Sequence, residues 1–262
     1  MIDELYLHNN IHPTAILEGD IRMGLRNTIG PHVVLRGNIS LGDDNVFKTG
    51  VCFENNVTIG HQNIFYPYVS VGALGEMGAK GDRFVEEGGV AIGDEVVLRE
   101  FVCVHSPVYK YETSIGSKVY IMNKGYVAHD CVIGTGVMMS AGVLLGGRVE
   151  IGEYANLGLG ATVHQRVHVG AYAMVGMQTV VSKDILPFAL VAGNPARIHR
   201  FNRVGAERKG LEEKYISEME ALFHRGNFSS YESSNPAWVE IGKFMEAHPL
   251  SLLKLRSDTE RK

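Results

Sequence analysis

The stretch that decides the fold runs over residues 115–181 and reads IGSKVYIMNKGYVAHDCVIGTGVMMSAGVLLGGRVEIGEYANLGLGATVHQRVHVGAYAMVGMQTVV. An aliphatic residue returns at every sixth position throughout it. The twelve consecutive matches are Ile115, Ile121, Val127, Ile133, Met139, Leu145, Ile151, Leu157, Val163, Val169, Val175 and Val181. Neither the helical period of 3.6 nor the strand period of 2 produces such a pattern.

A six-residue period fits a prism-shaped coil, in which each hexapeptide forms a short flat strand and a corner. Three hexapeptides close one turn, and pairs of an aliphatic residue and a glycine do recur at 18-residue intervals, at 23, 41 and 59 and again at 115, 133, 151 and 169. The aliphatic side chain points inward and stacks on its equivalent about 4.8 Å away. We expect the glycine that follows it to ease corners with positive φ. The pattern therefore predicts an all-β solenoid, a hexapeptide parallel β-helix.

The repeat is interrupted twice and then ends. Residues 73–91 and 106–114 exceed the period and are predicted to be external loops, which often carry function on a rigid scaffold. Near Pro187 the repeat stops, and helical spacing of apolar residues appears over 211–226 and from 236 to about 255. We predict a β-helix over 1–190 and an α-helical region over 191–262.

Composition excludes several classes of protein. A formal charge of −4 and 45% hydrophobic residues argue against a nucleic-acid-binding protein and against a disordered chain. Three cysteines without a CxxC spacing argue against a disulfide framework and against a cysteine-built zinc site. The N-terminus resembles no signal peptide and no stretch of 18 apolar residues occurs, so we expect a cytoplasmic protein without membrane insertion.

One outer face of the predicted coil gathers chemically active residues. Val127, Leu145 and Val163 stack on this face, and the residues that follow them are His129 with Asp130, then Gly146, Gly147 and Arg148, then His164, Gln165 and Arg166. His105 lies one turn below. The alternative interpretation is a set of solvated or interface side chains.

These residue types suggest acyl transfer from a thioester to a hydroxyl or an amine. His129 is a candidate general base, and an unhindered N–H at Gly147, one turn away, is a candidate oxyanion donor. Neighbouring residues of a strand point in opposite directions, so we expect Asp130 to contribute only near a corner or through its backbone. No serine or cysteine is placed as a nucleophile, and Cys131 is predicted to fill the core, which favours direct attack. A flat outer face has no pocket, so we expect a homotrimer with clefts between subunits.

The chain resembles the UDP-N-acetylglucosamine acyltransferases of lipid A biosynthesis along nearly its full length. The shared motifs are IHPTAI at 11–16, RE at 99–100, AHDCVIG at 128–134, VHQ at 163–165 and GN at 193–194. The resemblance implies a left-handed coil, a catalytic His129 with Asp130, and an oxyanion glycine at Gly147. It also implies substrate contacts from His105, His164, Gln165, Asn202 and Arg208.

Several positions depart from that family's pattern. Tyr126 and Arg148 replace family histidines and are expected to contact substrate, and Val204 replaces a glutamate. The sugar-contact loop is replaced by GEMGAKGDRF at 75–84, which leaves Lys80 and Asp82 as candidates. Met177 stands where long-chain enzymes have a glycine in the acyl groove, so we expect a short or medium acyl chain.

The function expected is transfer of an acyl group from coenzyme A or acyl carrier protein to an amine or hydroxyl of a nucleotide-linked sugar. No cofactor and no metal are expected beyond that thioester co-substrate. The first alternative is an authentic 3-O-acyltransferase of lipid A biosynthesis. Two further alternatives are a zinc hydratase of the carbonic anhydrase type, which needs three converging histidines, and a non-catalytic scaffold.

Overall fold

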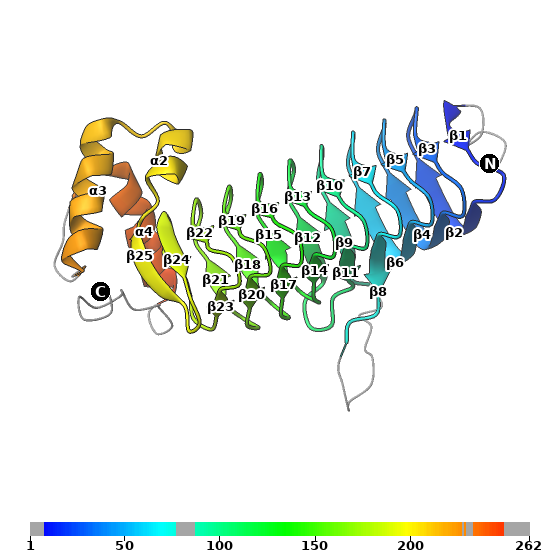
Figure 1. The fold of residues 1–262 in the computed structure, drawn as a ribbon. Coiled ribbons are helices and arrows are strands. Elements are labelled where there is room, and N and C mark those ends of the chain that lie inside the picture. Colours follow the sequence, from blue (N-terminus) through cyan, green and yellow to red (C-terminus); the bar gives the residue numbers. More distant parts are fainter. Residues whose placement is uncertain (1–7, 77–86, 227, 229–232, 249–262) are drawn as a thin grey trace.

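The computed structural model describes residues 8–76, 87–226, 228 and 233–248. Its main body is a left-handed parallel β-helix with three faces, closed at one end by a helical cap (Figure 1). Strands one turn apart pair in parallel with a register of 18 residues wherever the repeat is uninterrupted, as between Val132 and Glu150. The predicted all-β solenoid with a C-terminal helical cap is therefore confirmed.

The strands on the first face pair in one continuous ladder. They are β1 (Asn10–Ile11), β3 (Thr28–Ile29), β5 (Val46–Phe47), β7 (Ile64–Phe65), β10 (Val97–Leu98), β13 (Tyr120–Ile121), β16 (Met138–Met139), β19 (Asn156–Leu157), β22 (Met174–Val175) and β24 (Ala189–Ala192). The last strand, β25 (Arg197–Phe201), turns back and pairs antiparallel with β24.

The second and third faces are joined at the N-terminal end of the coil. The second face holds β8 (Ser70–Ala73), β11 (Cys103–His105), β14 (Tyr126–Val127), β17 (Leu144–Leu145), β20 (Thr162–Val163) and β23 (Val180–Val181). The third face holds β9 (Gly89–Ile92), β12 (Glu112–Ile115), β15 (Val132–Ile133), β18 (Glu150–Ile151) and β21 (His168–Val169). The longer strands β2 (Ile16–Met23), β4 (Val34–Leu41) and β6 (Cys52–Ile59) run across both faces without interruption.

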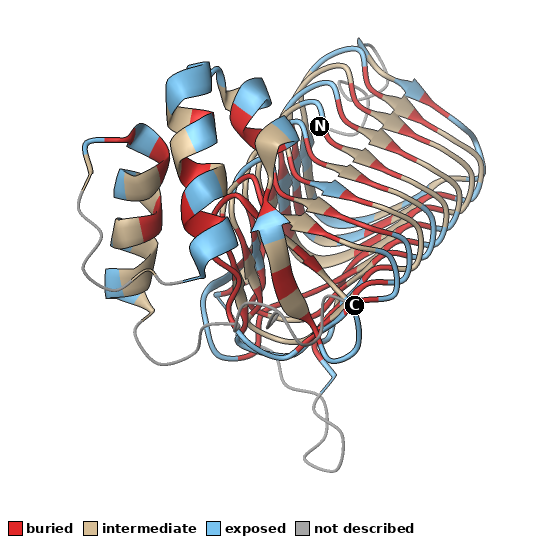
Figure 2. Cartoon of the chain, turned by 60° about the vertical axis from the view of Figure 1, so that its left-hand side comes forward, coloured by how far each residue is buried: buried red, intermediate tan, exposed pale blue. Residues whose placement is uncertain are grey.

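The six-residue repeat builds the core. All twelve aliphatic residues of 115–181 at the repeat position are buried, none more than 2% exposed. Figure 2 shows buried positions recurring along every coil. Burying each such side chain contributes about 1.5–3 kcal/mol relative to leaving it in water. The inward-facing position of these residues is confirmed.

The glycine that follows the aliphatic residue has a different role from the one predicted. Gly134 does not have a positive φ. The left-handed residue of each corner lies two positions after the glycine, at Gly136 in this turn and at Lys118 in the turn before. A Cβ on Gly134 would lie only 2.6 Å from the backbone nitrogen of Glu153 in the next turn. The prediction that these glycines relieve positive φ is therefore wrong; they allow adjacent turns to approach closely.

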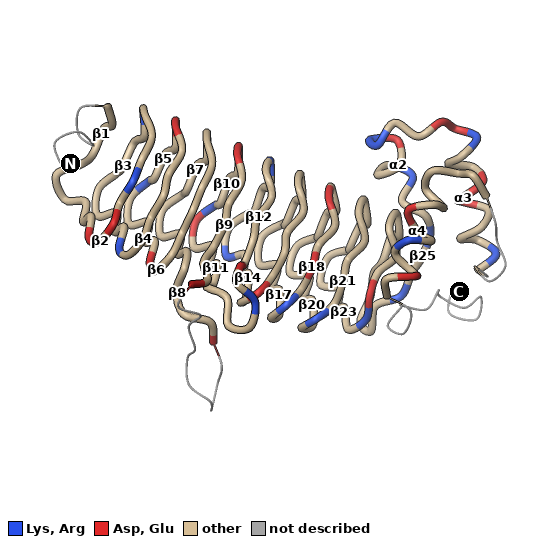
Figure 3. The backbone as a smooth tube through the Cα atoms, turned by 180° about the vertical axis from the view of Figure 1, so that it is seen from behind, with Lys and Arg blue, Asp and Glu red and all other residues tan. Residues whose placement is uncertain are grey.

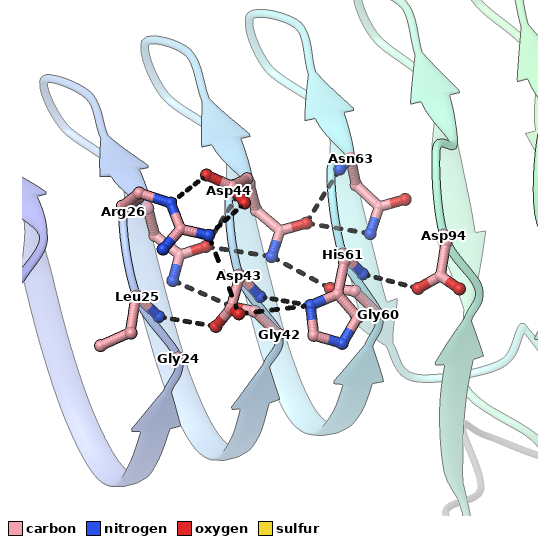
Figure 4. A network of polar contacts seen from close by, with 12 residues as sticks. Gly24, Leu25, Arg26, Gly42, Asp43, Asp44, Gly60, His61, Asn63 and Asp94 are labelled. Atoms are coloured by element: carbon pink, nitrogen blue, oxygen red, sulfur yellow. Dashed lines mark hydrogen bonds and ion pairs between the residues drawn. The ribbon is translucent and has the colours of Figure 1, made fainter.

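Buried asparagines satisfy the backbone in the first turns. The Asn45 side chain accepts from the Asn63 N–H at 2.9 Å and donates to the Gly60 carbonyl at 3.0 Å, and Asn27 repeats the pattern one turn below. Figure 4 labels the partners Gly42, Gly60 and Asn63 of this network. These side chains are fully buried. Since an unpaired buried polar group is costly, each amide holds one corner in register with the next.

The external loops start and end close to the predicted positions. Of the first predicted loop, residues 77–86 lie outside the described residues, including the candidates Lys80 and Asp82. The second runs over residues 106–111, because β12 begins at Glu112, inside the segment expected to be loop.

The cap contains α2 (Arg203–Lys209), α3 (Glu213–Arg225) and α4 (Pro236–Ala247). Helix α3 is capped by Gly226 with φ 76°, and the helix predicted over 211–226 is confirmed at 213–225. The short helix α2 was not anticipated, and the expected end of α4 near residue 255 lies outside the described residues. None of the helices in the described part of the chain is long and apolar enough to span a bilayer.

Candidate active site

The candidate site lies at the corner after the second face, on three successive turns. Asp130, Arg148 and Arg166 are the left-handed residues of these corners, with φ between 61° and 64°. They are spaced by 18 residues, so they form one column along the coil. Figure 3 shows basic residues along this edge near β17 and β20.

His129 and Asp130 form a hydrogen-bonded pair. The Nδ1 of His129 lies 2.7 Å from Oδ2 of Asp130, and their side chains are 14% and 0% exposed. The left-handed corner makes this possible, because it turns Asp130 out of the strand alternation. Asp130 therefore lies at a corner, as expected if it is to contribute. Both its side chain and its backbone make hydrogen bonds there.

The Asp130 carboxylate is held by the second external loop. It accepts N–H bonds from Val108 at 3.1 Å, Tyr109 at 3.0 Å and Lys110 at 2.7 Å. The backbone N–H of Asp130 donates to Oγ1 of Thr113 at 2.8 Å. Burial raises the pKa of Asp130, but these N–H bonds and His129 outweigh it and lower the pKa below its ordinary value. An ionised Asp130 can only accept, so the His129 Nδ1 carries the proton and Nε2 is left as the basic atom.

Gly147 lies directly against the imidazole of His129. A Cβ on Gly147 would lie 2.5 Å from Cε1 and 2.6 Å from Nε2 of that ring. Among the hydrogen bonds of the described residues, none uses the Gly147 N–H. The His129 ring and the Gly147 backbone are therefore in contact across one turn, the adjacency expected from their 18-residue spacing.

A hollow of about 280 Å³ opens over this point within a single chain. Its lining comprises Glu76, Tyr109, His129, Gly147, Arg148, Gln165 and Arg166. The Arg148 guanidinium stacks on the Tyr109 ring at 3.9 Å, and that ring lies 5.8 Å from the ring of His129. The expectation of a flat face without a pocket is therefore wrong, because the loop over residues 106–111 raises a wall beside the corner.

Two predicted residues, His105 of the previous turn and Tyr126 of the strand before His129, pack against each other. His105 is buried and meets the Tyr126 ring edge to face at 5.2 Å. The Tyr126 hydroxyl donates to Glu76 at 3.1 Å. Burial and the Glu76 carboxylate raise the pKa of Tyr126, so its hydroxyl stays protonated. Tyr126 is thereby connected to the hollow through Glu76.

His164 and Gln165 are exposed on the turn above. Gln165 lines the hollow, whereas the His164 Nδ1 lies 3.1 Å from the Gln165 carbonyl. Cys131 next to the pair is not a nucleophile, because burial raises the pKa of its thiol to about 12 and its S–H donates to the Gly146 carbonyl. The described residues that line the hollow include no cysteine, serine or threonine.

Three predicted residues lie elsewhere in this chain. Met177 is 69% exposed on a different corner, after β22. The Asn202 side chain donates to the Tyr172 carbonyl at 2.7 Å, and Arg208 is exposed on α2, which Figure 1 shows at the capped end of the coil.

Sequence reasoning missed the contributions of Tyr109 and Glu76. Both belong to external loops, where no period assigns a direction to a side chain. The available signal was the length of the loops themselves. Tyr109 supplies one of the three N–H groups that hold Asp130 and the ring on which Arg148 stacks, so this loop shapes the site as well as covering it.

Comparison with known proteins points to one group of enzymes. The model of the family described as UDP N-acetylglucosamine O-acyltransferase, domain 2, matches residues 184–234. The acyl-[acyl-carrier-protein]–UDP-N-acetylglucosamine O-acyltransferase of Campylobacter concisus is 34% identical over 143 residues, which cover 53% of this chain and 55% of that protein. The chain spans about three fifths of the length of the curated relatives it matches.

Solved structures extend the likeness to the whole fold. The UDP-N-acetylglucosamine acyltransferase from Campylobacter jejuni superposes with a TM-score of 0.85 at 24% identity, covering 95% of this chain and 100% of that one. The UDP-N-acetylglucosamine O-acyltransferase of Moraxella catarrhalis gives 0.78 at 29% identity, covering 91% and 92%. The chain is a hexapeptide-repeat β-helix that resembles the UDP-N-acetylglucosamine acyltransferases from the coil to the helical cap.

Proposed function

We propose that this chain is an acyltransferase that moves an acyl group from a thioester to a hydroxyl or amine of a nucleotide-linked sugar. The observation that carries the proposal is the meeting of the His129 imidazole, fixed by buried Asp130, with the backbone of Gly147. The names of the relatives and structural neighbours support the same chemistry.

In the proposed mechanism, the Nε2 of His129 accepts the proton of the attacking hydroxyl or amine while Nδ1 stays bonded to Asp130. The sugar oxygen or nitrogen forms a bond to the thioester carbonyl carbon. The Gly147 N–H donates to the oxyanion that develops there. The C–S bond then breaks, and the leaving thiolate takes the proton from His129. No cofactor beyond the thioester co-substrate enters these steps.

The charges of the hollow favour a phosphate-bearing acceptor. Arg148 and Arg166 both line it, one turn apart. A guanidinium group can bind two oxygens of one phosphate at the same time. The relatives are named for UDP-N-acetylglucosamine and for acyl carrier protein. We retain coenzyme A as a second donor and an amino sugar as a second acceptor. Met177 is exposed at the position where long-chain enzymes have a glycine, so we propose a short or medium acyl chain. Both donors are cytoplasmic thioesters, so we place the reaction in the cytoplasm.

We also propose that the active form is a homotrimer. Asn202 and Arg208 belong to the cap, whereas the hollow lies on the β14, β17 and β20 corners. A neighbouring subunit could bring such cap residues to the hollow. Mixing inactive His129→Ala and Arg208→Ala chains should then restore part of the activity, and a lack of recovery after proven subunit exchange would exclude a shared site.

The alternative functions require different residues in the lining of the hollow. A hydratase of the carbonic anhydrase type needs three converging histidines, and His129 is the single imidazole in the lining of the hollow among the described residues. A scaffold has no need of a glycine against His129. The lipid A 3-O-acyltransferase remains open, because it uses the same base and oxyanion donor on a specific hydroxyl.

The proposal is tested by mass spectrometry of products. Acyl thioesters of coenzyme A and of acyl carrier protein, in several chain lengths, are incubated with UDP-N-acetylglucosamine and with UDP- and dTDP-linked amino sugars. A 3-O-acyl product identifies the lipid A enzyme, and an N-acyl product identifies an amino-sugar acyltransferase. The absence of any acylated sugar across the panel, with properly folded protein, would reject the proposal.

A further inference from the structure

A second cluster of ligand-type side chains lies where the helical cap meets the third face of the coil. It joins His168 of β21, Asp184 between β23 and β24, and His248, which follows α4. One potential ligand atom from each residue lies within 4.8 Å of the others. These residues take no part in the proposed acyl transfer.

The cluster is built around His168. Its Nδ1 lies 3.4 Å from Oδ1 of Asp184, and its ring centroid lies 4.0 Å from that of His248. Asp184 is a fixed partner: its side chain is 4% exposed, and it also accepts the His168 backbone N–H at 2.8 Å. On the other side of the ring, Nε2 lies 3.7 Å from Oε2 of Glu150.

The donor types are those of a zinc-type site, and the 3.4 Å between Nδ1 of His168 and Oδ1 of Asp184 is the spacing of two ligands on one metal. Ligand atoms at about 2.0–2.1 Å from a tetrahedral metal are separated by roughly 3.4 Å. Two imidazoles and one carboxylate are ligands that Zn²⁺, Co²⁺ and Ni²⁺ accept. A ligating histidine usually donates its second ring N–H to a carboxylate. Glu150 lies 3.7 Å from that nitrogen, so a small shift of its side chain would let it accept this bond.

We propose that His168, Asp184 and His248 bind a divalent transition metal of the zinc type, with Glu150 orienting His168. His248 and His168 are separated by 80 positions in the sequence, so a metal between them connects the end of α4 to the coil. The metal would hold the cap against the solenoid, and the fourth position would be left to solvent.

Activity is not a suitable readout for this site. Glu150 also pairs with Nζ of Lys110 at 2.9 Å, and the Lys110 N–H donates to Asp130. A change at the cluster could therefore reach the His129–Asp130 pair indirectly. Metal binding and thermal stability report on the cluster itself and stand whether or not the proposed acyl transfer is correct.

The test uses full-length protein freed of metal by a chelator and then titrated with Co²⁺ or Zn²⁺. We expect one equivalent of Co²⁺ to produce the visible d–d spectrum of tetrahedral coordination without a thiolate charge-transfer band. Zn²⁺ at one hundred times its Kd should raise the Tm by about 5 °C. Both signals should be lost in His248→Ala and in His168→Asn. They should persist in His32→Asn, which removes an exposed histidine from the opposite end of the coil and keeps a residue tolerant of its positive φ.

Three results would overturn the proposal. The first is wild-type protein that shows neither the spectrum nor the Tm increase. The second is binding that persists unchanged in both cluster variants, which would place the metal elsewhere. The third is a thiolate band, which would assign the metal to a cysteine. A circular dichroism spectrum of each variant establishes that the coil is intact.

Discussion

Replacing Gly147 with alanine tests the geometry of the candidate site with a single methyl group. The added Cβ would lie 2.5 Å from Cε1 and 2.6 Å from Nε2 of His129. Non-bonded carbon atoms pack at about 3.5–4.0 Å, so the ring has to move by about 1 Å. The backbone at Gly147 does not have a positive φ, so alanine introduces no backbone strain of its own.

The size of the effect follows from what holds the ring. His129 is tied to Asp130 by a 2.7 Å bond, and three backbone N–H groups keep that carboxylate in place. The imidazole can move away from a new methyl group only by stretching this bond or rotating Nε2 away from the donor. A displacement of 1 Å at a reacting group costs about 10²-fold in rate. We therefore expect kcat to fall about 10²-fold in Gly147→Ala.

The assay is the release of free thiol from the thioester, with product confirmed by mass spectrometry. Gly242→Ala is the matched control, because a Cβ on Gly242 in α4 would meet nothing within 4 Å. It should retain full activity and gain about 0.5–1 kcal/mol of stability. Activity of Gly147→Ala within threefold of wild type, at equal folded content, would refute the packing argument.

Three further substitutions follow from the same structure. Asp130→Asn should lower kcat by about 10³–10⁴-fold, measured by thiol release, since an amide that donates to Nδ1 places the ring proton on Nε2. The same variant tests a pH effect: the pKa of Asp130 is below its ordinary value of 3.8, so its stabilisation is complete above that value and lost as the pH falls through the lowered pKa. Acid denaturation followed by circular dichroism should be less steep in Asp130→Asn, and an unchanged profile would contradict the assignment. Asn45→Leu should lower the free energy of unfolding by about 3 kcal/mol in urea, because it leaves the Asn63 N–H and the Gly60 carbonyl unpaired, whereas exposed Asn38→Ala should cost less than about 1 kcal/mol. Met177→Gly should shift the donor preference toward longer acyl chains in a chain-length panel, and an unchanged preference would remove Met177 from the acyl groove.

The repeat predicted the coil because inward and outward directions are fixed by a six-residue period. It also placed His129 and Gly147 one turn apart, since their spacing is the length of a turn. The role of the glycines after each aliphatic residue was predicted wrongly. The sequence shows at which positions glycine recurs. The reason for glycine, the close approach of the adjacent turn, is visible only in the distances between turns.

Other features depended on contacts that no period encodes. The His129–Asp130 pair requires a left-handed φ at Asp130, which a strand alternation does not predict. The ring of Tyr109 and the wall of the hollow come from a loop outside the repeat. His168 and His248 meet through the folding back of the cap, so their proximity is a property of tertiary structure alone.

The central claim is that His129 is the general base for acyl transfer to a nucleotide-linked sugar. The most direct measurement is the steady-state rate of sugar acylation by wild type, His129→Ala and the control His32→Asn. We predict a loss of 10²–10⁴-fold in kcat for His129→Ala with little change in KM for the thioester, and no loss for the control. Acylation at the wild-type rate by a folded His129→Ala protein would contradict the account.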